Sequence, residues 1–62
     1  MVLKKLENGE LVQIDLHHDE EGKRYATVYG VGFTIEKGSR EEKEAYEIAQ
    51  LMAEEIEIIT KE

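Results

Sequence analysis

The chain has no cysteine, no proline and no tryptophan, and its aromatic residues are three tyrosines and one phenylalanine. Without cysteine there is no disulfide, no thiolate zinc site and no thiol nucleophile. No segment approaches the roughly 18 consecutive apolar residues of a membrane span, and no basic segment leads into an apolar stretch with a cleavage site. We therefore expect no membrane span and no targeting signal, and a soluble protein that is cytoplasmic or recombinant.

Basic residues are also few, because 8 Lys and Arg face 15 Asp and Glu, which leaves a formal charge of −7. They are scattered apart from the pairs Lys4-Lys5 and Lys23-Arg24, whereas phosphate binding needs clustered basic side chains. We therefore expect no nucleic-acid binding. Apolar residues make up 40% of the chain, too many for a disordered acidic tail. Residues 1–62 are expected to form one small domain.

The first strong local signal is Asn8-Gly9, which stands between two apolar segments. Asn-Gly in this setting predicts a β-hairpin, because both residues tolerate a positive φ. A two-residue turn would place Glu7 opposite Glu10, which is unfavourable. A three-residue loop with Gly9 in a bulge avoids that contact, and the sequence leaves both possibilities open.

The segment Asp19-Glu20-Glu21-Gly22 predicts a second hairpin, since Asp opens type I turns and Gly supplies the left-handed residue of a bulge. If Asp19 faces Lys23, the register of the two strands follows. One face then pairs Leu16 with Ala26, Ile14 with Val28 and Val12 with Gly30. The other pairs His17 with Tyr25, Gln13 with Tyr29 and Leu11 with Val31.

The third strand is expected to run from about residue 24 to residue 36, with Gly30 and Gly32 inside it. Glycine within a strand marks a bulge, a bend or the close approach of another backbone. We interpret the two glycines as room for a helix that crosses the sheet.

From Ser39 onward the apolar period changes from two to 3.6 residues. Ser39 with Glu42 matches a capping box. The apolar stripe of the expected helix consists of Ala45, Ile48, Ala49, Met52, Ile56 and Ile59. A strand over residues 56–60 is the alternative, but no turn residue follows Ala53, so one continuous helix is favoured.

The predicted fold class is therefore α+β: a curved three-stranded antiparallel meander packed on one C-terminal helix, in the order β-β-β-α. One helix covers one face of such a sheet, and a large apolar patch left in water indicates an interface. We expect a homodimer through the second sheet face. The expected interface residues are Leu11, Tyr29, Val31, Phe33, Ile35, Leu51 and Ile58. The alternative is a bulge at Gly30 or Gly32 that turns part of the third strand inward.

No motif predicts catalysis, a cofactor or a metal site, and we expect a protein that is not an enzyme. His17 and His18 precede three acidic residues, but neighbours on a strand point to opposite faces and do not converge on one ion. A stack of His17 on Tyr25 is the favoured interpretation. Gly30-Val31-Gly32 lacks the third glycine of a dinucleotide fingerprint. Ser39 has a capping role and no activating base.

Several features together resemble a de novo designed β-β-β-α mini-protein. They are the Asn-Gly and Asp-Glu-Glu-Gly turns, the Ser/Glu capping box, the paired strand glycines and the absence of proline and cysteine. This resemblance implies a thermostable, self-associating scaffold without enzymatic chemistry.

The segment 15–47 combines the Asp-Glu-Glu-Gly turn at 19–22, the sequence Tyr25-Ala26-Thr27-Val28, and Ser39 before Glu41-Glu42 and Ala45. In these features it resembles antitoxins of the HicB type. This resemblance implies the alternative function, an acidic interaction protein that neutralises a basic partner such as a nuclease.

Overall fold

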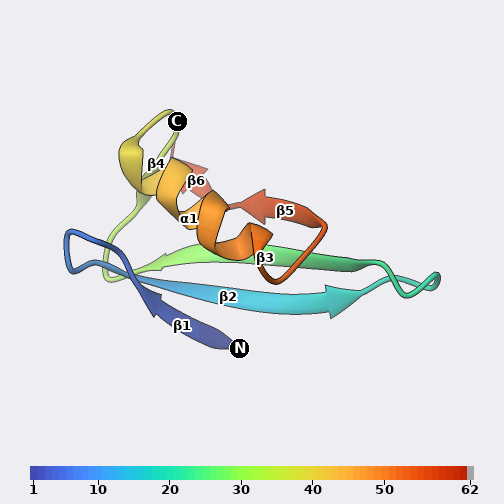
Figure 1. The fold of residues 1–62 in the computed structure, drawn as a ribbon. Helices are drawn as coiled ribbons and strands as arrows, with labels where there is room; N and C mark the ends of the chain where they lie inside the picture. The colour runs from blue at the N-terminus through green and yellow to red at the C-terminus, as the bar shows by residue number, and fades with distance from the viewer. Residues whose placement is uncertain (62) are drawn as a thin grey trace.

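The computed structural model describes residues 1–61, which form an α+β domain with one helix and a mixed four-stranded sheet (Figure 1). The elements in chain order are β1 (Val2–Lys5), β2 (Leu11–His18), β3 (Arg24–Val31), β4 (Ile35–Glu36), α1 (Arg40–Gln50), β5 (Glu55–Ile58) and β6 (Thr60–Lys61). The large sheet has the order β1-β2-β3-β5, and β4 pairs with β6 in a separate two-stranded sheet. Within residues 1–61, no helix has the length and apolar character needed to cross a bilayer.

The first hairpin uses the three-residue loop. The backbone N–H of Leu6 donates to the carbonyl of Glu10 at 2.7 Å, and the N–H of Gly9 donates to the carbonyl of Leu6 at 2.9 Å. Gly9 has a φ of 93°, as a bulge glycine requires. The loop therefore keeps Glu7 and Glu10 from facing each other. The pairing of β1 with β2 begins with Lys5 opposite Leu11 and ends with Val2 opposite Ile14.

The second hairpin has the same construction, and the register predicted for it is confirmed. The N–H of Asp19 donates to the carbonyl of Lys23 at 3.1 Å, and Gly22 has a φ of 83°. The Asp19 carboxylate also accepts the N–H groups of Glu21 and Lys23. The pairs include Leu16–Ala26, Ile14–Val28, Val12–Gly30, His17–Tyr25, Gln13–Tyr29 and Leu11–Val31.

The prediction of a third strand that continues to about residue 36 is wrong, because β3 ends at Val31. Gly32 takes a φ of 78°, which ends the extended backbone. The chain then turns back close to Gly30, where an added Cβ would overlap the carbonyl oxygen of Phe33. This turn carries Ile35 into the core and starts the short strand β4.

The helix starts where the capping box predicts. The N–H of Glu42 donates to Ser39 Oγ at 3.2 Å, and the Glu42 carboxylate accepts the N–H of Gly38 at 3.1 Å. Two further acidic residues of α1 bind the first hairpin loop. Glu44 accepts the N–H of Glu7 at 2.7 Å, and Glu41 accepts the amide of Asn8 at 3.3 Å. The N-terminal half of α1 is thereby attached to the β1–β2 turn.

The prediction of one continuous C-terminal helix is wrong, because α1 ends at Gln50 and residues 55–58 form the strand β5. This strand pairs in parallel with β3, so the domain is not a three-stranded meander alone and does not end in a helix. The sequence of β5 alternates Glu and Ile, which suits a strand with one buried face. Pairing with the open edge of β3 satisfies backbone groups and outweighs helix propensity in this segment.

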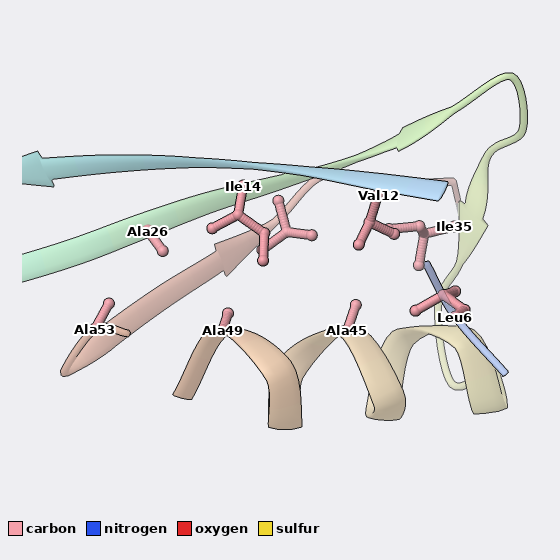
Figure 2. Packing of buried hydrophobic residues seen from close by; sticks show 9 residues of the cluster. Leu6, Val12, Ile14, Ala26, Ile35, Ala45, Ala49 and Ala53 are labelled. Carbon is pink, nitrogen blue, oxygen red and sulfur yellow. The ribbon is translucent and has the colours of Figure 1, made fainter. Parts of the chain in front are cut away.

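The core lies between α1 and one face of the large sheet (Figure 2). Ala45 and Ala49 of the helix face Val12 and Ile14 of β2, and their small side chains let the helix approach the sheet closely. The buried apolar residues are Leu6, Val12, Ile14, Ala26, Val28, Ile35, Ala45, Ala49 and Ala53. α1 therefore covers one face of the sheet, called the inner face below, and leaves the other uncovered.

Candidate interaction surface

The uncovered sheet face, called the outer face, is defined by the residues that alternate with the core positions of each strand. On β2, for example, Val12 and Ile14 are fully buried and their neighbours point the other way. The outer face comprises Leu3, Lys5, Leu11, Gln13, Asp15, His17, Tyr25, Thr27, Tyr29, Val31, Glu55 and Glu57.

Four apolar side chains gather at one end of the outer face, and we call them the outer patch: Leu3, Leu11, Tyr29 and Val31. Leu11 pairs with Val31, and Gln13 lies between Leu3 and Tyr29 in the adjacent row. Their exposed fractions are 55%, 38%, 37% and 40%. The patch therefore spans three strands and is open to solvent throughout.

The sequence predicted three of these four residues correctly as neighbours on one face: Leu11, Tyr29 and Val31. The other predicted interface residues lie elsewhere. Ile35 is fully buried, so no partner can reach it without unfolding the core, and Phe33 is half-buried and packs against that core. The reason is the turn at Gly32, beyond which the alternation of β3 no longer holds.

The last two predicted residues follow α1 and lie away from the outer face. Leu51 is the C-cap of the helix and is 87% exposed. Ile58 is half-buried on β5, opposite Val28, and packs against the core. Both were assigned to a continuous helix, and the end of that helix at Gln50 removes the basis of the assignment.

Leu3 belongs to the outer patch and was missed. Its place follows from the first hairpin, because the three-residue loop sets Leu3 opposite Gln13. The unfavourable contact between Glu7 and Glu10 in the shorter turn was the signal that could have located it.

The far end of the outer face holds an aromatic pair. The rings of His17 and Tyr25 stack with centroids 4.9 Å apart and an interplanar angle of 18°, which confirms the predicted contact. The neighbouring Asp19 carboxylate accepts two backbone N–H groups in the hairpin loop. No three potential metal-ligating side chains converge anywhere in residues 1–61. His17 thus packs on Tyr25, and Asp19 binds the backbone of the hairpin loop.

Charges of both signs border the outer face. Lys23 Nζ and Glu55 Oε1 form an exposed ion pair at 2.6 Å. The hydrogen bond to Glu55 and its negative charge raise the pKa of Lys23. The Leu3–Tyr29 row has Lys5 in the row on one side of it and Asp15 in the row on the other side. Glu57 lies in the same row as Asp15. The outer patch thus has charges of both signs beside it.

A second surface feature lies on the other side of β5, in a groove between this strand and α1 that we call the edge groove. Its volume is about 610 Å³. Ile56, Ile58 and Tyr46 supply apolar surface to it. The remaining lining residues are polar or charged: Lys37, Glu42, Lys43 and Thr60.

Comparison with known proteins adds no family to these observations. The chain matches no protein-family model. It matches no curated protein by sequence and no solved structure by fold. The outer patch and the edge groove are the two surface features of this domain that bear on its function.

Proposed function

We propose that this protein is a non-enzymatic scaffold domain of designed type that forms a homodimer through the outer patch. The observation that carries the proposal is the exposure of four apolar side chains, each at least 37% exposed, on the sheet face that α1 leaves uncovered. Contiguous apolar surface on a small soluble protein generally marks an interface. Burying it against a copy removes this surface from water.

The charge distribution favours a second copy as the occupant. A chain of formal charge −7 repels its copies at long range, so contact is least costly where a positive side chain can meet a negative one. In a dimer whose two-fold axis runs along the Leu3–Tyr29 row, this row packs against the same row of the second protomer. Lys5 of each protomer then lies toward Asp15 of the other. A self-complementary arrangement of this kind is what an isologous interface requires.

The size of the domain is compatible with this interface. A standard interface buries about 800 Å² on each partner. That would take roughly a fifth of the accessible surface of 4481 Å². The outer patch and the residues around it on the outer face would have to supply this area together.

Molar mass in solution tests the proposal. By sedimentation equilibrium we expect the mass to rise from 7.2 kDa toward twice that value as the concentration increases. Tyr29→Lys should weaken the dimer by at least about tenfold, the factor for about 1.4 kcal/mol. The matched control is Leu51→Lys, which places the same charge on an exposed apolar residue outside the patch.

Circular dichroism must show that both variants are folded. A wild-type protein that keeps a mass of 7.2 kDa at millimolar concentration would contradict self-association. Equal weakening by Leu51→Lys would contradict the assignment to the outer patch.

Regular construction supports the designed-scaffold part of the proposal. The two hairpins use the same three-residue loop with a glycine bulge, and the helix begins with a capping box, all of which are design rules. A scaffold should unfold far above ordinary growth temperatures, and its outer patch should capture no other protein from a cell lysate. Capture of one basic protein through the outer patch, with an affinity that falls as salt rises, would support the antitoxin-like alternative instead.

A further inference from the structure

The strand β5 is an open edge of the large sheet. It pairs with β3 on one side, and no further strand lies beyond it in residues 1–61. The N–H of Ile59 donates to the carbonyl of Val28, so the backbone of Ile59 points toward β3. Successive residues of a strand point their N–H and C=O groups to alternate edges, so those of Ile56 and Ile58 point away from β3, to the open edge. An open edge of this kind is a template for another strand.

The edge groove lies along this open edge. Ile56 and Ile58 are half-buried on the inner face of β5, and Tyr46 of α1 is exposed above them. The inward-facing side chains of an additional strand would enter this groove. The same edge therefore offers backbone partners and apolar surface together, which is the pattern of strand addition.

The outer side of β5 is acidic. Glu55 and Glu57 alternate with the two isoleucines and are exposed on the outer face. Glu55 is already paired with Lys23, whereas Glu57 has no ion-pair partner among the described side chains of residues 1–60. In a strand paired with β5, alternate side chains would lie directly beside these carboxylates.

We infer that this edge binds an extended peptide of another protein as an additional strand, and that this peptide alternates basic with apolar residues. The basic side chains lie beside Glu57 on the outer face, and the apolar ones enter the edge groove beside Tyr46. The reverse orientation is disfavoured because it would bring the basic side chains of the peptide toward Lys43 in the groove and set its apolar side chains beside Glu57. A second copy of β5 is disfavoured as well, because it would set glutamates beside glutamates.

This inference concerns a different surface from the outer patch and does not depend on self-association. Its direct test uses short synthetic peptides with blocked ends, in which lysine alternates with valine. A block-ordered peptide of the same composition has equal charge and hydrophobicity but cannot place them on opposite faces of a strand. By fluorescence anisotropy, the alternating peptide should bind at least about tenfold more tightly, a difference of about 1.4 kcal/mol.

Two further comparisons locate the site. Glu57→Lys should weaken binding of the alternating peptide by about tenfold, while Glu20→Lys, the same charge change in the second hairpin loop, should change it by less than about twofold. N-methylation of those peptide amides that face β5 should abolish binding. N-methylation of the other set should have little effect, since only one edge of the peptide pairs.

Equal affinity for the block-ordered peptide would overturn the inference, because it would show general attraction of cations to an acidic protein. Equal weakening by Glu20→Lys, or tolerance of N-methylation in both sets, would do the same. Amide chemical shifts that change at Ile56 and Ile58 support the inference. Changes confined to Leu11 and Val31 would place the peptide on the outer patch and would overturn it.

Discussion

Gly30 packs directly against Phe33. A Cβ atom on Gly30 would overlap the Phe33 carbonyl oxygen and lie 3.1 Å from the ring Cε1. Because the main clash is with backbone, the turn from β3 to β4 has to move to accommodate any side chain. This contact explains why the chain can fold back over the sheet and deliver Ile35 to the core.

Gly30→Ala is therefore expected to lower the free energy of unfolding by about 1–3 kcal/mol, as overpacking does. Urea denaturation followed by circular dichroism measures this. The control is Gly22→Asn, where nothing lies within 4 Å and Asn tolerates the φ of 83°. The packing explanation fails if Gly30→Ala is as stable as the control variant.

The stacked pair His17–Tyr25 should contribute to the stability of the second hairpin. A double-mutant cycle of His17→Ala and Tyr25→Ala is expected to give a coupling of about 0.5–1.5 kcal/mol. His18→Ala in place of His17→Ala should give a coupling near zero, since its side chain points to the other face of β2. Thermal or urea unfolding supplies the four stabilities, and a vanishing His17–Tyr25 term would contradict the stack.

The helix N-terminus makes another prediction. Ser39→Ala removes the acceptor for the N–H of Glu42 and should cost about 1 kcal/mol of stability. Ser39→Asp keeps an acceptor at the cap position but loses the hydroxyl that donates to the Glu36 carbonyl at 2.6 Å, so its stability should lie between those of Ser39→Ala and the wild type. Chemical denaturation of the three proteins checks this order, and a neutral Ser39→Ala variant would argue against the capping bond.

The exposed ion pair at the start of β5 predicts a pH dependence. The hydrogen bond and negative charge of Glu55 raise the pKa of Lys23 above its ordinary value of 10.5. A raised folded-state pKa means that the pair stabilises the fold fully below 10.5 and that this contribution disappears as pH rises through the folded-state value.

An NMR titration of the Lys23 side chain should show the raised pKa in the wild type and a return toward 10.5 in Glu55→Ala. Glu20→Ala should leave the titration of Lys23 unchanged. Identical titration in the wild type and Glu55→Ala would show that Glu55 is not the cause.

Local chemistry made the two hairpins and the helix start predictable. Gly9, Gly22 and Ser39 act on their immediate neighbours, and turn geometry sets the strand register. The strand β5 depends on a distant partner. The alternation of Glu and Ile permits a strand at residues 55–58, but a helix is also compatible with this segment, and the open edge of β3 decides between the two. The helix end at Gln50 was missed for the same reason.

The candidate surface was predictable only as far as the alternation of each strand continues. Leu11 and Val31 follow from the register of the second hairpin. Ile35 does not, because the positive φ of Gly32 interrupts the period between it and Val31. A sequence shows that a glycine permits a turn, but the packing against Gly30 decides that the turn is made.

The parallel pairing of β5 with β3 also sets an order of events in folding. Each hairpin joins neighbouring segments and can form in about 1–10 μs. Val28 and Ile58 meet only after α1 has closed the connection between their strands, which requires a longer chain closure. We therefore expect the edge of β3 to be unpaired until α1 docks, and intermolecular pairing at that edge to compete with folding only before that step.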